Sequence, residues 1–544
     1  MAYKNRQKRL GKLSKPNDHA LTFVVITAVL GFFTHLVYTR SGWMMNPDES
    51  ELIATARLAA MPGGLNFNYT TSTYGPIWPE FLAILNHLGM TLDHFNAHRL
   101  ALIMKIFIFL TPQYLAIKQM GLFKLSPVLI PLNFILFAPT SIEFSFLTSG
   151  LLPLAFMTAA IVVVKRVRHR FAVQTAGILF ALAFMSKYQV ALLSIILVYF
   201  IFQRSLTNGA LDSRKFISDI IGFLLSIILT FSAFIIFLIQ SQSFSKFFQE
   251  SLLLSINYST TQGFGGGANL LDKLSVGSSL LLGQPLLIIS SLLMLFLAYV
   301  EMKSKPNFEV LRKKFSAINF SVLALLVFFA LGFLTISIPG NGFPHYILFF
   351  LWALTAFLLT FEDPPKVASP MQRKSNSSEN TPTTKFFNVA TILIVMSMCL
   401  NIFVPAVKSY LNAPSVIESN QIRFEELSRS EILAYCPPKS QVLVWGWSSE
   451  LFAYFDWNPP PNIVNDAARI RISQLSNNTI SRLKSAVANR DTDCIYEAIG
   501  ANFFGGMTLD EGVKSLPKDS LELLSLEYQQ TTLGDGTSVW SRKR

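Results

Sequence analysis

Long apolar runs alternate with short polar segments along most of the chain. An apolar run of about 20 residues is long enough to cross the hydrocarbon core of a membrane as a helix. The pattern predicts about eleven transmembrane helices, at Ala20–Thr39, Arg99–Lys118, Ser126–Thr140, Phe146–Val164, Phe171–Ser186, Tyr188–Gln203, Phe216–Gln240, Ser279–Val300, Ile318–Ser337, Phe343–Phe361 and Phe386–Val404. We therefore expect an α-helical polytopic membrane protein.

The composition supports a membrane protein. Of the 544 residues, 51% are hydrophobic and 14% are charged, whereas soluble proteins carry about 25% charged residues. Phe alone occurs 48 times, and the mean hydropathy is +0.44. These values exclude a disordered chain, a nucleic-acid-binding domain and an ordinary cytosolic enzyme.

The basic residues indicate an orientation in the membrane. The chain carries 45 Lys and Arg against 32 Asp and Glu, for a net charge of +13. Apart from the N-terminal segment, the basic loops are 118–124, 165–170, 204–215, 303–314 and 366–385. Loops rich in Lys and Arg stay in the cytoplasm. We therefore expect a multi-pass protein of the plasma (inner) membrane with a cytoplasmic N-terminus, whose first helix is retained because no small-x-small cleavage site follows it.

The composition changes after the last apolar run, which predicts two domains. Residues 1–405 form the predicted membrane domain, with short juxtamembrane helices within 40–98 on the outer side. Residues 406–544 carry frequent charges and predict an extracytoplasmic soluble α/β domain. Its predicted strands are Gln441–Gly446, Asp493–Ala498 and Leu524–Tyr528, and its predicted helices are Ser415–Tyr435 and Asn478–Asn489.

Two of the three cysteines, Cys436 and Cys494, lie in this outer domain. A disulfide between them suits an oxidising compartment, and closing a loop of about 58 residues would contribute roughly 4 kcal/mol in the chain-entropy model. Two buried free thiols are the alternative, since the spacing alone does not supply the geometry of a bridge.

An acidic motif follows the first predicted helix. Pro47 followed by Asp48 and Glu49 indicates a helix over Asp48–Ala60, in which acidic residues near the start favour the helix dipole. Helix capping would explain both carboxylates. Their place at the membrane boundary favours a functional role, because an unpaired carboxylate is costly there. We interpret Asp48 as a candidate general base, and both interpretations stay open for Glu49.

Further polar motifs lie on the same side of the predicted membrane. Tyr74–Pro76 opens a second short helix that ends near His87, Lys187 interrupts the apolar sequence, and Phe343–Tyr346 begins the tenth run. A lysine at a helix end often only extends its charge to the interface, and His345 could be a structural residue. Together they place a cation and a hydrogen-bond donor where a phosphate would bind.

These motifs, in this order and on one side, resemble the GT-C superfamily of membrane glycosyltransferases. The closest likeness is to the protein O-mannosyltransferase and lipid A aminoarabinose transferase branch. The likeness rests on Asp48–Glu49, Tyr74–Pro76, Lys187–Tyr188 and Pro344–Tyr346. The outer domain's Val444–Trp447 segment also resembles the tail domain of many bacterial relatives.

The resemblance implies that a sugar moves from a polyprenyl-phosphate donor to an acceptor glycan, lipid or protein outside the cell. We expect inversion at the anomeric carbon, with Asp48 as the catalytic base and Glu49 supporting it. Lys187, His345 and Tyr346 would bind the donor phosphate, and Tyr74, Arg57 and Tyr188 would line the substrate site. The only cofactor under consideration is a divalent metal ion that Asp48 and Glu49 could share.

Three other classes of protein remain as alternatives. A lipid-linked glycan transporter or flippase would carry charges near the middle of the membrane, and Lys105 is the main residue of that kind. An envelope polymer ligase would depend on outer Arg and His residues and would not need Asp48. A receptor would bind its ligand in the outer domain, and the polar motifs of the membrane part would then be incidental.

Overall fold

The computed structural model describes the greater part of the predicted membrane domain and the core of the C-terminal domain. The described residues are 18–40, 47–61, 75–137, 146–207, 210–253, 269–303, 317–340, 342–361, 426–445, 451–452, 455–460, 492–497, 518–534 and 538–543. The predicted helices Phe386–Val404 and Asn478–Asn489 lie outside them, as does the linker to the C-terminal domain.

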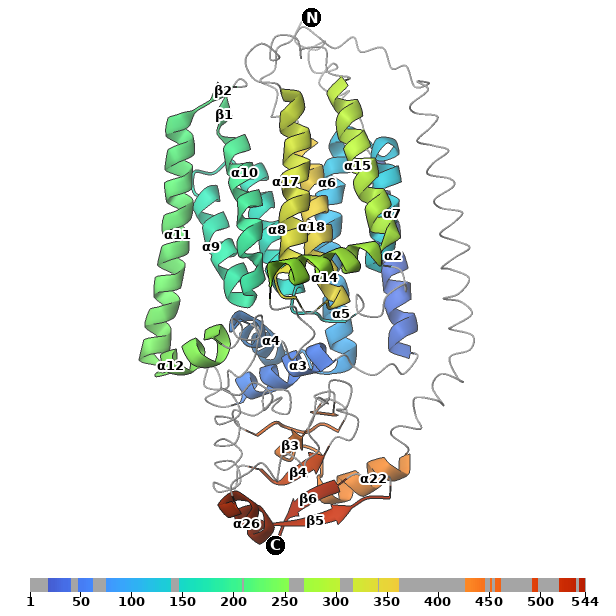
Figure 1. Cartoon of the computed structure of the whole chain (residues 1–544), viewed down its shortest axis with the longest axis vertical. Helices are drawn as coiled ribbons and strands as arrows, with labels where there is room; N and C mark the ends of the chain where they lie inside the picture. The colour runs from blue at the N-terminus through green and yellow to red at the C-terminus, as the bar shows by residue number, and fades with distance from the viewer. Residues whose placement is uncertain are drawn as a thin grey trace, which may run out of the picture.

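Most of the described chain is helical, and the apolar helices pack side by side as one bundle (Figure 1). The helices of the bundle are α2 (Asp18–Arg40), α5 (His94–Lys105), η1 (Ile106–Leu110), α6 (Thr111–Met120), α7 (Leu122–Phe137), α8 (Leu151–Arg166), α9 (Ala172–Ser186), η3 (Tyr188–Leu193), α10 (Ser194–Arg204), α11 (Ser213–Gln240), α14 (Leu270–Leu282), α15 (Pro285–Lys303), α17 (Ala317–Ser337), η6 (Pro344–Tyr346), α18 (Ile347–Leu358) and η7 (Leu359–Phe361).

Two helical stretches among the described residues are long and apolar enough to cross a membrane. They are Phe95–Met120, which runs through α5, η1 and α6, and Ser213–Gln240, which is α11. A third is possible if α14 and the start of α15 form one broken span. The other apolar helices of the bundle are shorter. The helical class is therefore confirmed, with two or three candidate spans among the described residues.

The run Ser279–Val300 differs from the prediction of one straight helix. The chain bends by 89° between α14 and α15, and α14 begins earlier, at Leu270. The bend falls at Gly283 and Gln284, just before Pro285. Proline suits the first turn of a helix and cannot continue a preceding one. As a result α14 lies across one end of the bundle in Figure 1.

Helix α18 forms the centre of the bundle, because every residue from Ile347 to Leu358 is buried. Its Trp352 donates a hydrogen bond to Thr158 of α8, at 2.9 Å. Helix α11 lies at the edge of the bundle and exposes apolar side chains such as Leu224, Ile228 and Leu229. A helix of this length with an exposed apolar surface is typical of contact with lipid.

Two short helices, α3 (Pro47–Ala60) and α4 (Ile77–His87), lie between the bundle and the C-terminal sheet (Figure 1). Both were predicted from Pro47 and Pro76 at their starts. One set of α3 side chains, with Leu52, Ile53 and Ala56, belongs to the core of the bundle. Another set, with Ala54, Leu58 and Ala59, packs with the core of the C-terminal domain. Helix α3 thus joins the two cores.

The C-terminal domain contains a four-stranded sheet in the order β3-β4-β6-β5. Strands β3 (Val442–Trp445) and β4 (Cys494–Glu497) pair in parallel, while β6 (Ser538–Arg542) pairs antiparallel with both β4 and β5 (Tyr528–Thr532). Helix α22 (Glu426–Tyr435) was expected as the end of a longer helix, and β6 was not predicted.

The predicted strand Leu524–Tyr528 is wrong over most of its length. Residues Lys518–Glu527 form helix α26, and β5 begins only at Tyr528. Leu and Glu, which dominate this segment, favour helices, whereas the Thr residues at the end of β5 are β-branched and favour strands. Pro517 just before the helix also marks its start.

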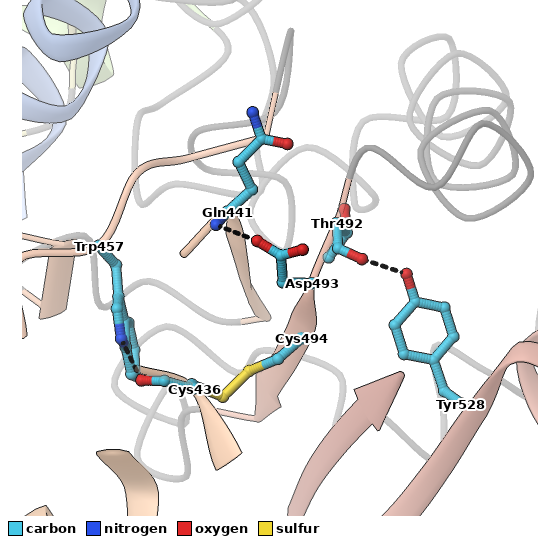
Figure 2. Close-up of a disulfide and its surroundings, with 7 residues drawn as sticks. All are labelled: Cys436, Gln441, Trp457, Thr492, Asp493, Cys494 and Tyr528. Atoms are coloured by element: carbon cyan, nitrogen blue, oxygen red, sulfur yellow. Dashed lines mark hydrogen bonds between the residues drawn. A yellow bond between two sulfur atoms is a disulfide. The ribbon is translucent and has the colours of Figure 1, made fainter. Parts of the chain in front are cut away.

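Cys436 and Cys494 form a disulfide, the pairing considered from the sequence, with their Cα atoms 5.9 Å apart (Figure 2). The bridge connects the end of α22 to the start of β4. Next to it, the Trp457 indole donates a hydrogen bond to the Cys436 carbonyl, at 2.8 Å. On the other side, Tyr528 donates one to the Thr492 carbonyl, at 2.5 Å. The disulfide is therefore part of the core of this domain.

Candidate functional site

Four segments that are distant in the sequence meet at the end of the bundle that faces α3 and α4. They are the start of α4, the segment 146–150 before α8, the end of α9, and η6. The Gly75 amide donates a hydrogen bond to the Ser186 carbonyl, at 3.0 Å. A Cβ atom at position 75 would lie 1.8 Å from the Met185 carbonyl oxygen. Only glycine lets the two backbones approach so closely, which explains the glycine of the Tyr74–Pro76 motif.

Lys187 lies at the middle of this cluster. It follows the last turn of α9 in an extended conformation, and it is only 9% exposed. Its ammonium group donates a hydrogen bond to the Ser149 hydroxyl and lies 4.9 Å from the centre of the Tyr346 ring. The Ser149 carbonyl accepts a hydrogen bond from the Trp78 indole, at 2.7 Å. The segment 146–150 thus joins α4 to Lys187.

The Phe343–Tyr346 motif forms the adjoining wall. The His345 ring stacks on Phe343 at 5.6 Å between ring centres and meets Tyr346 edge to face at 4.7 Å. Both His345 and Tyr346 are buried. The structure therefore brings together Lys187, His345 and Tyr346, the three residues expected to bind a phosphate. A buried ammonium, a hydroxyl and an imidazole are groups that can bind an oxyanion.

The acidic motif approaches the same segment from α3. Glu49 is fully buried, and its carboxylate accepts a hydrogen bond from the Leu147 amide. Because Ser149 contacts Lys187, the acidic and the basic motifs bind residues only two positions apart. The backbone of Asp48 lies in the first turn of α3, whereas its side chain, like Tyr74, lies outside what the structure describes.

Sequence reasoning missed two histidines, one beside Glu49 and one beside Lys105. His98 of α5 has its Nε2 atom 3.4 Å from the Glu49 carboxylate, and its ring meets His35 of α2 edge to face, at 6.1 Å. His35 in turn lies 2.9 Å from the Lys105 ammonium. Histidines within apolar helices were the available signal, and Lys105 had been noted as an exceptional charge in its run.

The three residues expected to line the substrate site have different surroundings. Arg57 donates hydrogen bonds to the carbonyls of Phe452, Trp457 and Leu92, at 2.9, 3.0 and 2.9 Å. Burial lowers the pKa of its guanidinium, which the carboxylate of Asp456 partly opposes. Arg57 thus holds α3 to the C-terminal domain.

Tyr188, next to Lys187, points its hydroxyl at Ser251, 3.0 Å away. It packs edge to face against Phe184 of α9, at 5.3 Å. The third expected residue, Tyr74, is outside the described part of the chain.

Among the described residues, no group of three or more His, Cys, Asp and Glu side chains is arranged to hold a metal ion. The ion that Asp48 and Glu49 could share depends on the Asp48 side chain, which lies outside that part of the chain. Both Glu49 oxygens face protein groups, the Leu147 amide and His98.

The chain matches no family model, no curated protein and no solved structure.

Proposed function

We propose that the protein is an integral-membrane glycosyltransferase that moves a sugar from a polyprenyl-phosphate donor to an acceptor on the extracytoplasmic side. The observation that carries the proposal is the meeting of Lys187, His345 and Tyr346 with the segment 146–150, which also binds Glu49. A phosphate site next to an acidic motif, at one end of an apolar bundle, fits a lipid-linked donor.

In the proposed reaction, Asp48 removes the proton from the acceptor hydroxyl as its oxygen attacks the anomeric carbon of the sugar. The bond between that carbon and the donor phosphate breaks, so the configuration inverts. Lys187 and His345 stabilise the negative charge that develops on the leaving phosphate. The acceptor is an envelope glycan, a glycolipid or a protein.

The proposal includes about eleven membrane spans with a cytoplasmic N-terminus. Contacts around two of the predicted cytoplasmic loops, 165–170 and 204–215, support the placement of the basic loops at one end of the bundle. The Arg204 guanidinium donates hydrogen bonds to the carbonyls of Val164 and Val167, both at 2.7 Å. Lys215 donates to the Arg204 carbonyl, at 2.9 Å. The hairpin of β1 (Leu206–Thr207) and β2 (Ala210–Leu211), in the same loop, lies at the end opposite α3 and α4 (Figure 1).

The test is transfer by the purified protein in lipid nanodiscs. A panel of polyprenyl-phosphate hexoses and pentoses is offered with an envelope extract as the source of acceptor, and released polyprenyl phosphate is measured by mass spectrometry. Asp48→Asn should lower the rate by about 100-fold or more, since a general base contributes at least that much. Release from no donor, or an equal rate for Asp48→Asn, would contradict the proposal.

A separate variant tests whether Lys187 binds the donor phosphate. Lys187→Met removes a charge-assisted hydrogen bond, worth about 1.5–3 kcal/mol, so the KM for the donor should rise roughly 10-fold or more. Lys118→Met removes the same charge at an exposed position and should leave that KM unchanged. An unaltered donor KM in Lys187→Met would assign the phosphate to other groups.

A transporter of lipid-linked glycans is the second candidate. The buried Lys105, His35 and His98 favour it, because ionisable groups within apolar helices often serve ion-coupled transport. Movement of a fluorescent polyprenyl-phosphate sugar across vesicles containing the protein, unaffected by Asp48→Asn, would favour this candidate over the transferase.

A further inference from the structure

Four ionisable side chains form a second buried cluster, which the contact between Glu49 and Leu147 connects to the segment 146–150 beside Lys187. Glu49 lies 3.4 Å from the Nε2 atom of His98, and Lys105 lies 2.9 Å from the Nε2 atom of His35. The two imidazole rings meet edge to face between these pairs. Glu49, His98 and Lys105 are at most 1% exposed and His35 is 5% exposed. The cluster comes from three helices, α2, α3 and α5.

The chemistry of these groups places opposite charges at the two ends of the cluster. An ammonium on Lys105 would donate to the His35 Nε2 atom, which requires a neutral His35 ring with its proton on Nδ1. Glu49, at the other end, accepts from the Leu147 amide and faces His98. Charges removed from water are costly unless an opposite charge and hydrogen bonds compensate them. Lys105 is the cation of the same buried cluster, at the far end of the contacts that run from Glu49 through His98 and His35.

We propose that His98 and Lys105 are positioning residues for the acidic motif, and that Glu49 is a buried anchor which does not touch the substrate. Both of its oxygens face protein groups, and no part of it is exposed. Glu49 fixes the first turn of α3 against α5 and the segment 146–150. Asp48, the preceding residue on that turn, is thereby held in place. The link to Asp48 rests on the proposed function, whereas the anchor itself does not.

Thermal unfolding of the purified protein in detergent tests the anchor without any transfer assay. Lys105→Met should lower the Tm by about 4 °C, because it removes the cation that opposes the Glu49 charge within the buried cluster. Adding Glu49→Gln to Lys105→Met removes the Glu49 charge, and this double variant should recover at least half of the loss in Tm. Lys118→Met, the matched exposed control, should leave the Tm unchanged. Additive losses in the double variant would show that Lys105 and Glu49 are not coupled, and would overturn the inference.

Transfer kinetics then test positioning. His98→Phe and Glu49→Ala should each lower kcat roughly 10-fold without changing the donor KM, since small displacements of a catalytic group are costly. Their combination should be no slower than either single variant, and His98→Gln, which offers Glu49 an amide N–H, should recover most of the rate. Multiplicative losses, or a loss of transfer in Glu49→Ala at an unchanged Tm, would instead assign Glu49 to the reaction.

These two measurements separate the inference from the proposed function. If the wild-type protein transfers no sugar, the proposed function fails, and the Tm of the Lys105→Met and Glu49→Gln variants still decides whether the anchor exists. If transfer is found and the double variant shows additive losses, the function stands and the anchor is overturned.

Discussion

Gly75 controls how closely α4 approaches the end of α9. Its amide bonds to Ser186, and its Cα faces the Met185 carbonyl with no room for a side chain. Because Lys187 follows directly, this contact also fixes the backbone from which the lysine extends. A backbone contact of this kind cannot be relieved by rotating a side chain, so the position tolerates no larger residue.

Gly75→Ala should therefore destabilise the protein by about 3 kcal/mol, at the upper end of the cost of overpacking, and weaken donor binding. Thermal unfolding and the donor KM measure the two effects. Gly283→Ala is the matched control, because a Cβ atom there would meet its nearest neighbour at an ordinary 3.4 Å. If both alanine variants unfold at the wild-type temperature, α4 and α9 are not in close contact.

The residues that carry the site were predictable to different degrees. Lys187, His345 and Tyr346 stood out because polar side chains interrupt apolar runs, and the structure brings them together. The pairing of Glu49 with His98 was not predictable, because the two residues are far apart in the sequence and no local pattern links them. A histidine in an apolar helix becomes informative only when the packing of α5 against α3 is known.

At the scale of elements, helix starts were easier to predict than bends. Pro47 and Pro76 located α3 and α4, since proline suits the first turn. The bend before Pro285 and the helix α26 were missed, because apolar periodicity alone does not separate one long helix from two, or a short helix from a strand. Helix α3 is the element whose role depends most on tertiary structure, because it contributes to two cores.

Arg57 fastens this helix to the C-terminal domain, and its substitution tests that role. Arg57→Lys keeps the charge but cannot reach three carbonyl groups with one ammonium, so the C-terminal domain should dock less firmly on α3. Hydrogen exchange should rise in β3 and in α3 while α18 stays protected. Arg99→Lys, at an exposed site on α5, is the control. Unchanged exchange in β3 would show that the apolar contacts alone hold the domains together.

At the scale of the whole molecule, apolar length and basic loops predicted a helical bundle with a small domain after it. Charge in a loop reports which side of a membrane it occupies, and the contacts of Arg204 and Lys215 gather such loops at one end. The C-terminal sheet lies beyond α3 and α4 at the other end (Figure 1). The proposed orientation therefore predicts that the basic loops lie in the cytoplasm and that the C-terminal domain lies outside.

Cysteine labelling in intact spheroplasts tests this orientation. In a Cys399→Ser background, Ser525→Cys in α26 should react with an impermeant maleimide, because the proposed orientation places the C-terminal domain outside. Arg168→Cys, in the basic loop between α8 and α9, should react only after the membrane is permeabilised. Both positions are exposed in the folded protein, so burial does not protect either. Labelling of Arg168→Cys in intact spheroplasts, with Ser525→Cys protected, would reverse the orientation and place Lys187, His345 and Tyr346 on the cytoplasmic side.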